Sequence, residues 1–455
     1  MSRPAAVELG YRCAPDATDL AHIPGRGGWP VFGRTLEVLR DLHAVAAGNV
    51  REWGEVSRLR LLGQGGLMVT GADHYQRIFQ DTEQIFSAEK GYDRQLGAFY
   101  PRGLLLMDFD EHRANRRLMQ GAFKVAALQR YLEMMQPTIA RHVQAWGRRP
   151  GFVFYPAIKQ LLLEVGAQCF LGIEDFEREA ASINRLFLEL NAGMLALLRV
   201  ELPFGAYGRA KRARRELERW CERMIAERRR HGGGDDVLSH LCRETDEHGR
   251  PYEMKAIVDH TIFLLFAAHD TSTSALAHLA MYLGGNAAMQ ARLREHLTAF
   301  GPGPLAHGDL PRLDFAEHCF HEAMRLHPPV PMAMRRTIRE TELAGYRIPA
   351  HTVLHLPMMI NQRDPRWWTD PERFDPDRFA PPRSEQRRHP MAFHPFGGGA
   401  HKCIGMHFAE MLVKVFLHRF VQTYSFRTPA GYAPRLEWVP LPKPADGVPL
   451  MLTPL

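Results

Sequence analysis

Apolar residues recur at every third or fourth position through most of residues 72–330, and few prolines interrupt these windows. This spacing predicts a mostly helical chain over that range. Residues 24–70 instead begin with the Pro/Gly-rich stretch "IPGRGGWPVFG" and continue into short pieces typical of strands. Pro-rich turns and short strands are expected again over 338–395, followed by a last helix that begins near Gly405. The pattern predicts a mainly α protein with a small β region.

The longest helical signal covers residues 254–284. At 1.5 Å per residue this helix would extend about 45 Å, the width of a whole domain. It contains Asp259, His260, His269 and Asp270, so the cost of burying charge in lipid argues against a membrane span.

The segment "RRRHGGGDDVLSHL" (228–241) has the composition of a linker between domains. However, an Asp pair that leads into an apolar-periodic run is typical of a capped helix start. We therefore predict a loop here and no domain boundary.

The chain has 455 residues, 45% of them hydrophobic, and this length alone favours two or three domains. Its formal net charge is +7, but basic residues alternate with acidic ones. This disfavours nucleic acid as a partner and favours a modest basic face for docking an acidic protein. The six cysteines are scattered without a C-x-x-C pair, which predicts a reducing compartment. The N-terminus lacks a signal peptide and a membrane span, so we expect a soluble, cytoplasmic monomer.

One cysteine lies in an unusual setting, the stretch "FHPFGGGAHKCIGMHFAEM" (393–411). Cys403 comes just before a helix, whose unpaired N–H groups and dipole favour a thiolate and a lowered pKa. Glycines on both sides permit turns and let backbone approach a flat ligand; they are Gly397, Gly398, Gly399 and Gly405. Such a bare sulfur is suited to be an axial metal ligand.

Two other roles for Cys403 are open but less favoured. Zinc could be bound together with His394, His401 or His407. However, structural zinc sites require pairs of ligands at short sequence spacings, and no second cysteine is near Cys403 in the sequence. A nucleophilic cysteine could use His401 or His407 as its base, but nothing else follows a hydrolase pattern.

The order Phe396, Gly399, Cys403, Gly405 resembles the haem-binding loop of the cytochrome P450 monooxygenases. The resemblance implies haem b, with Cys403 as the axial ligand of the iron and the other three residues against the cofactor. The chemistry would then be the cofactor's, since thiolate ligation favours O–O cleavage.

Further motifs follow in the order of the same family. "EAMR" places Glu322 and Arg325 on one helical face, which alone would be an ordinary surface pair. Together with Arg373 of "DPERF" it resembles the family's Glu-Arg-Arg lock, a structural device that holds the cysteine loop.

The segment "DEHRANRRLMQGAF" (110–123) resembles the family's helix over the haem edge. His112 and Arg116 would there meet the haem propionates, a role to which arginine is well suited. His401 and Arg335 match two further propionate positions. Without the resemblance, a solvated basic helix face would explain the segment.

The segment "AAHDTS" (267–272) resembles the family's oxygen-activating signature. Ala267 would lie against the cofactor, Thr271 would face the oxygen-binding side, and Asp270 would relay protons. Ala268 stands where glycine is usual, so the local helix bulge that makes room for oxygen and water is in question.

The resemblance covers residues 24–455 as a single haem-thiolate monooxygenase domain after an N-terminal extension, 1–23, and so replaces the estimate from length. It implies insertion of one oxygen atom from O2 into an apolar terpenoid, steroid or fatty-acid-like substrate. A ferredoxin and its reductase are the expected electron donors. The expected substrate pocket includes Met194, Leu198, Phe263, Phe266, Met332 and Trp438.

Two other classes of function are compatible with a thiolate haem. A peroxide isomerase or dehydratase would need neither O2 nor electrons, but the intact Asp270–Thr271 pair argues against it. A non-catalytic haem sensor or carrier would be expected to have a separate signalling segment, and the sequence shows none.

Overall fold

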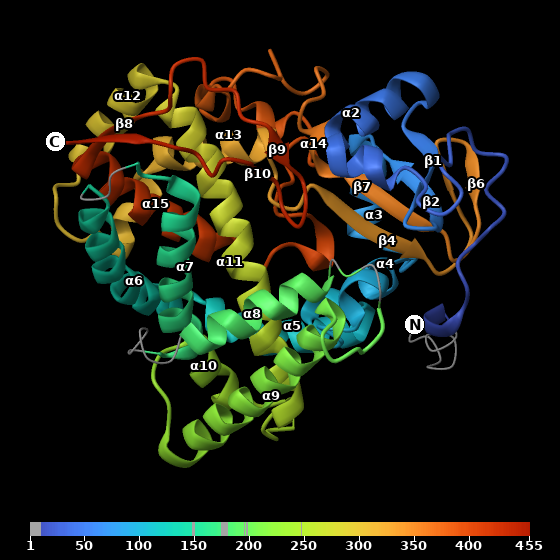
Figure 1. Ribbon diagram of the computed structural model, residues 1–455, viewed down its shortest axis with the longest axis horizontal. Helices are drawn as coiled ribbons and strands as arrows, with labels where there is room; N and C mark the ends of the chain where they lie inside the picture. The colour runs from blue at the N-terminus through green and yellow to red at the C-terminus, as the bar shows by residue number, and fades with distance from the viewer. Residues whose placement is uncertain (1–10, 148–150, 174–180, 195, 197–198, 247) are drawn as a thin grey trace.

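The computed structural model describes residues 11–147, 151–173, 181–194, 196, 199–246 and 248–455. Its α-helices are α2 (Thr35–Trp53), α3 (Ala72–Gln80), α4 (Ala88–Tyr92), α5 (Phe109–Gln120), α6 (Val125–Trp146), α7 (Phe154–Leu171), α8 (Ala181–Met194), α9 (Ala206–His231), α10 (Val237–Arg243), α11 (Met254–Gly284), α12 (Ala287–Thr298), α13 (Asp314–Leu326), α14 (Met358–Asn361) and α15 (Met406–Thr423). The predicted mainly helical architecture is confirmed (Figure 1).

The strands are short and lie near the two ends of the helical region. They are β1 (Val56–Leu61), β2 (Gln64–Val69), β3 (Phe86–Ser87), β4 (Met332–Thr337), β5 (Thr341–Leu343), β6 (Tyr346–Ile348), β7 (Val353–Pro357), β8 (Tyr424–Arg427), β9 (Leu436–Glu437), β10 (Lys443–Pro444) and β11 (Met451–Pro454). The main sheet has the order β1-β2-β7-β4-β3, with β2 and β7 parallel and the other neighbours antiparallel. It joins strands from the start of the chain to strands from its last third.

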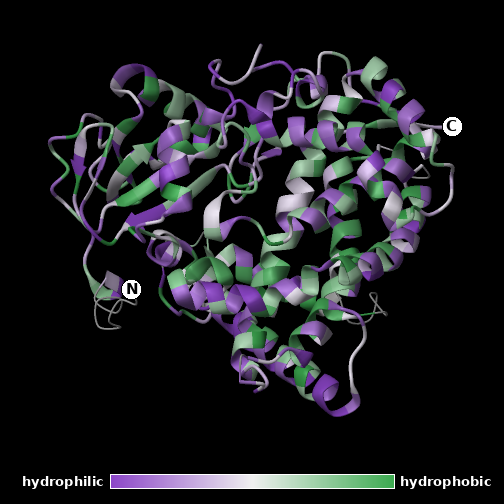
Figure 2. Cartoon of the chain, turned by 180° about the vertical axis from the view of Figure 1, so that it is seen from behind, coloured by the Kyte–Doolittle hydropathy of each residue, from purple (hydrophilic) through white to green (hydrophobic). Residues whose placement is uncertain are grey.

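The long helix α11 runs through the middle of the molecule, with α6, α7 and α15 on one side and the main sheet with α2 on the other (Figure 1). The largest apolar core contains residues of α6, α7, α11, α13 and α15. Two smaller cores lie on the side of the sheet, one of them against α2. Hydrophobic and hydrophilic residues alternate along most helices (Figure 2), as expected for helices with one buried side.

Local sequence signals explain two helix starts. The side chain of Asp236 accepts a hydrogen bond from the Ser239 N–H at 3.0 Å and caps α10, which confirms the capped loop predicted for residues 228–241. The last helix, α15, begins at Met406 directly after Gly405, as predicted. None of the described helices is both long and apolar enough to cross a bilayer.

A buried ionic cluster connects α13 to the segment that leads to α15. The Glu322 carboxylate accepts hydrogen bonds from Arg325 at 2.7 and 2.9 Å and from Arg378 Nε at 3.0 Å. All three side chains have no exposed surface. Arg378 also contacts Glu385 at 2.7 Å, so each buried charge has an opposite partner.

This cluster corrects the expected composition of the lock. Arg378, and not Arg373, provides the second guanidinium, because the side chain of Arg373 is exposed and only its carbonyl accepts hydrogen bonds. The chain contains two similar pieces, "PERF" (371–374) and "PDRF" (376–379). The sequence-based assignment used the first piece, whereas Arg378 of the second piece, "PDRF", is the residue that contacts Glu322.

The lock also reaches the cysteine loop. Arg325 Nη1 donates to the Gln362 carbonyl at 2.7 Å, and the Gln362 side-chain oxygen accepts the backbone N–H of His394 at 3.1 Å. Arg325 thus holds Gln362 in place, and Gln362 in turn holds the backbone at His394, near the start of the cysteine loop.

We expect Arg378→Ala to lower the free energy of unfolding by about 3–5 kcal/mol, because it leaves the charges of Glu322 and Glu385 buried with fewer partners. Arg373→Ala is the matched control and should change it by less than about 0.5 kcal/mol, since that side chain is exposed. Urea unfolding followed by tryptophan fluorescence measures both. Equal losses in the two variants would contradict the revised cluster.

Candidate active site

The loop that carries Cys403 folds back on itself and is fastened to α3. The Cys403 N–H donates to the Phe396 carbonyl at 2.9 Å, and the Gly397 N–H donates to the His394 carbonyl at 2.9 Å. Gly399 has φ +61°, and a Cβ there would overlap the carbonyl of Phe79 in α3. Gly399 is therefore required for the contact with α3 and for the turn itself.

The electrostatics of Cys403 differ from the sequence-based expectation. Although the Cys403 side chain itself is exposed, the chain around it removes enough water to raise the pKa of its thiol, and this outweighs the backbone N–H of Gly405 and the charges of Arg116 and Lys402, which lower it. The predicted lowering of the pKa by the helix terminus alone is wrong for the free thiol. A metal ion would supply the missing stabilisation, since a coordinating thiol is deprotonated outright.

The middle of α11 is less buried than the rest of the helix. Residues 257–264 and 273–280 are buried, whereas residues 265–272 between them are half-buried. The side chain of Cys403 is exposed, and a Cβ on Gly405 would meet no atom within 4 Å. The predicted signature 267–272 and the predicted sulfur loop thus both keep accessible surface.

Four basic side chains converge near the sulfur without an acidic partner. The rings of His112 and His401 lie 3.9 Å apart, and the charges of Arg116 and Arg335 act on both. Burial and these arginines lower the pKa of His112 to about 4, and they lower the pKa of His401 well below its usual range. Among the described residues, none of the four forms an ion pair with a carboxylate, and His112 Nε2 is buried without a hydrogen-bond partner. The set fits a ligand that brings its own carboxylates.

An exposed thiol sulfur, a half-buried stretch in the middle of a long helix and an unpaired basic set are together what a haem with two propionates requires. The residues present therefore fit the cofactor that the sequence implies. Zinc is not favoured at Cys403, because in the described part of the chain the sulfur belongs to no group of three ligand atoms close enough to share a metal ion.

The two residues of the acid-alcohol pair point to different partners. The Thr271 hydroxyl donates to the Ala267 carbonyl at 2.7 Å, one turn earlier in α11. α11 continues through Ala268 as a single helix, so the described backbone shows no bulge there.

Asp270 is held by three side chains from three elements. Its Oδ1 contacts Lys159 Nζ of α7 at 2.9 Å and His269 Nδ1 at 3.1 Å, and its Oδ2 accepts from Asn191 of α8 at 3.3 Å. Burial alone would raise the pKa of Asp270, but His269 and Lys159 together hold it below its usual range. The carboxylate is therefore ionised and connected to Lys159, whose side chain is partly exposed.

The hydrogen bonds of Asp270 continue to an aromatic cluster that sequence reasoning did not identify. The Tyr100 hydroxyl donates to Asn191 Oδ1 at 2.9 Å, and the Tyr100 ring stacks on Phe266 at 4.5 Å. Phe263 lies 6.1 Å from Tyr100. Phe263 and Phe266, both predicted for the pocket, thus share one apolar wall with Tyr100.

The other predicted pocket residues are dispersed. Met194 of α8 is half-buried against the largest core, and Leu198 lies outside the described residues. Trp438 and Met332 pack with α2 in a smaller core. For these two the structure shows ordinary core packing.

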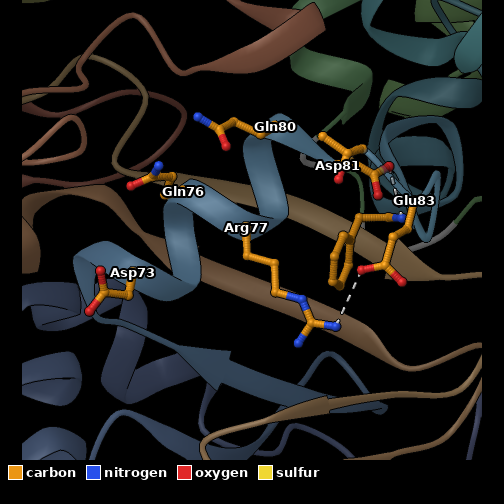
Figure 3. Close-up of a pocket in the computed structure, with 8 residues that line it drawn as sticks. Asp73, Gln76, Arg77, Gln80, Asp81 and Glu83 are labelled. Carbon is orange, nitrogen blue, oxygen red and sulfur yellow. Dashed lines mark hydrogen bonds and ion pairs between the residues drawn. The ribbon is translucent and has the colours of Figure 1, made fainter.

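A groove of about 370 Å³ follows the outer side of α3 and is lined mainly by polar and charged residues (Figure 3). Arg77 and Glu83 lie 3.7 Å apart across it, and Asp81 accepts from two backbone N–H groups beyond the helix end. No residue of the cysteine loop lines it, so it is separate from the site.

The exposed basic residues near the sulfur are not equivalent. Arg113 pairs with Asp110 at 2.6 Å, which offsets its charge. Arg117 and Lys402 are exposed, and among the described residues neither has an ion-pair partner. Of these three residues, Arg117 and Lys402 therefore offer unpaired positive charge to an acidic partner.

Comparison with known proteins agrees with this geometry. Residues 23–444 match the family model described as "Cytochrome P450". The chain is 37% identical to cytochrome P450 136 of Mycobacterium tuberculosis over 97% of this chain and 90% of that protein. It is 27% identical to the beta-amyrin 28-monooxygenase of Solanum lycopersicum over 95% and 92%. The structure of retinoic acid-bound cyanobacterial CYP120A1 superimposes with a TM-score of 0.88 and 27% identity, covering 96% of this chain and all of that one.

Gly399→Ala should destabilise the protein more than the cost of placing an alanine at a positive φ, because the added Cβ also overlaps Phe79. Gly345→Ala is the control, because Gly345 has φ +78° but no atom within 4 Å of a Cβ, and it should cost about 1–2 kcal/mol. Gly399→Ala adds the overlap with Phe79 and should lower the thermal midpoint further and reduce the haem content of the purified protein. Equal effects of the two variants would show that the contact with α3 does not hold the loop.

Proposed function

Since this chain belongs to the cytochrome P450 family and is a haem-thiolate monooxygenase, we propose that Cys403 is the cysteine that ligates its haem iron. The observation that carries the proposal is the exposed sulfur on a loop fastened by Phe396 and Gly399, three residues before the first turn of α15. The other five cysteines lack such a loop.

Arg116, Arg335, His112 and His401 would hold the haem propionates. Arg116 and Arg335 have no acidic partner among the described residues, which supports this role, since buried charges are normally paired. His112 Nε2 is buried without a hydrogen-bond partner and could meet a propionate oxygen. Arg335 is 4% exposed and donates to the Met334 carbonyl at 2.7 Å, which leaves the rest of its guanidinium for a carboxylate.

When bound, the haem supplies O2 activation and thiolate-assisted O–O cleavage. The chain's own part is to deliver protons. Thr271 Oγ1 would give its proton toward the open side of α11, and would do so by turning away from the Ala267 carbonyl. Asp270, on the adjacent side of the helix, would return a proton by way of Lys159.

The substrate of this chain would be an apolar molecule, with a terpenoid preferred over a steroid or a fatty acid. The aromatic wall of Tyr100, Phe263 and Phe266 supports an apolar substrate. The names of two relatives, one acting on beta-amyrin and one binding retinoic acid, favour isoprenoid carbon skeletons.

P450 enzymes take electrons from redox partners, and the donor proposed here is a ferredoxin with its reductase. The positive net charge of +7 and the unpaired Arg117 and Lys402 support an acidic partner protein. Such docking would be weakened by salt, because exposed charges are screened over about 8 Å at physiological ionic strength.

The test combines the holoenzyme with a ferredoxin, its reductase and NADPH, and screens terpenoids, steroids and fatty acids. We expect a substrate-induced haem spectral shift, O2-dependent product from at least one terpenoid, and reduction that slows as salt rises. Turnover of hydroperoxides without any electron donor, and no use of O2, would instead favour a peroxide isomerase. Ligand binding without any turnover would favour a sensor or carrier.

In the same assay Thr271→Ala should bind substrate and accept electrons normally but release several-fold more hydrogen peroxide per product. Asp270→Asn should lower kcat about tenfold or more and increase the solvent isotope effect, because it removes the ionised group that passes the proton. Thr273→Ala is the control, since Thr273 is also in α11 and donates to the carbonyl one turn earlier, but it is fully buried. Full coupling in both Thr271→Ala and Asp270→Asn would contradict the proposed relay.

A further inference from the structure

A cluster of nitrogen and oxygen ligands lies where α13 meets the first turns of α15. Glu317 and His321 are one turn apart on α13, and Glu410 and His407 are one turn apart on α15. Nothing in the proposed oxygen chemistry uses these four residues. They lie outside the cysteine loop, and Glu410 is seven positions after Cys403.

The side chains are already directed at one another. His321 Nε2 lies 3.2 Å from Glu410 Oε1, and His407 Nδ1 lies 3.2 Å from Glu410 Oε2. Ligand atoms of Glu317, His321 and Glu410 all lie within 4.8 Å of one another. Ligand atoms that share a tetrahedral ion at about 2.0–2.1 Å are separated by somewhat more than 3 Å, so small side-chain rotations suffice.

We propose that this cluster is a binding site for a divalent first-row transition-metal ion such as Zn²⁺, with Glu317, His321 and Glu410 as ligands and His407 as a fourth. The imidazole nitrogens distinguish it from an acidic surface patch. Imidazole with carboxylates is a ligand set that suits zinc and its neighbours in the first row, whereas Ca²⁺ and Mg²⁺ prefer oxygen alone.

The present contacts of Glu317 and Glu410 explain how two carboxylates are kept this close. Lys414 Nζ contacts Glu317 Oε2 and donates to the Leu310 carbonyl at 2.9 Å, and both imidazoles face Glu410. Lys414 leaves the second oxygen of Glu317 for a metal. On binding, the ion would coordinate His321 Nε2 and the Glu410 carboxylate. These coordination bonds would replace the present contact between the two side chains.

The site would join the two helices that position the sulfur. α13 also carries Glu322 and Arg325 of the buried cluster, and α15 begins directly after the cysteine loop. The charge of Glu410 is one of those that raise the pKa of Cys403. A metal here would therefore both link α13 to α15 and offset a negative charge that acts on the sulfur.

The test is a Zn²⁺ titration of the chelator-treated holoenzyme, with a competing chelator to suppress weak binding by the chain's other histidines. Metal content per chain, calorimetry and the thermal midpoint are the readouts. We expect one tight site per chain, a higher midpoint with Zn²⁺, and little effect of Ca²⁺ or Mg²⁺.

His321→Gln and Glu410→Gln should each weaken Zn²⁺ binding tenfold or more and remove the rise in midpoint. His389→Gln is the matched control, because His389 lies 3.1 Å from Asp73 in a simple pair with no third ligand, and it should bind Zn²⁺ like the wild type. His321 also lies 5.0 Å from the Phe393 ring, so Glu317→Gln is the second variant if His321→Gln fails to fold. The absence of a stoichiometric site, or equal binding by the ligand variants and the control, would overturn the proposal.

Discussion

The Glu322 carboxylate has no contact with solvent, and this burial is tolerated only because Arg325 and Arg378 surround it. Removing charges from water costs several kcal/mol per ion, so the geometry of the three groups is strongly restricted. The remaining donors of Arg325 reach the Gln362 carbonyl, and Gln362 holds the backbone of His394. The position of the sulfur loop is thus fixed through a chain of buried hydrogen bonds that begins at one carboxylate.

In the cluster around Glu322 every charged group has an opposite partner. Near the sulfur, by contrast, the basic groups have no acidic partner among the residues that the structure describes. Arg116, Arg335, His112 and His401 lie together, and burial lowers the pKa of both imidazoles. A protein interior rarely keeps charges unpaired. The family's haem, with an iron, a flat apolar ring and two propionates, would answer each of these features, so the cofactor would complete the electrostatics of the fold as well as its chemistry.

The start and length of α11 could be predicted because it is a long run with a clear apolar pattern. The start of α15 could be predicted because Gly405 comes directly before its first turn. The cap at Asp236 followed from two residues and their neighbours. Arg378 was missed because "PERF" and "PDRF" present the same local pattern, and only tertiary packing decides which guanidinium meets Glu322.

Two further features could not be predicted, for the same physical reason. The pKa of Cys403 depends on how much chain surrounds the sulfur, and reasoning from the helix terminus alone omits that burial. Tyr100, Lys159 and Asn191 come from segments far apart in the sequence, and their meeting around Asp270 depends on how α7, α8 and α11 pack. Motif reasoning therefore identified Asp270 but could not identify the groups that hold its charge.

The central claim is that the Cys403 thiolate binds the haem iron, and the carbon monoxide spectrum of the reduced protein tests it most directly. The wild type should show the strongly red-shifted band of a thiolate haem, because the thiolate donates electron density to the iron. Cys13→Ser should keep that band, since Cys13 is also exposed but lies far from the loop in sequence. Cys403→Ser should lose the band even when haem is still bound, and a Cys403→Ser protein that retains it would contradict the assignment.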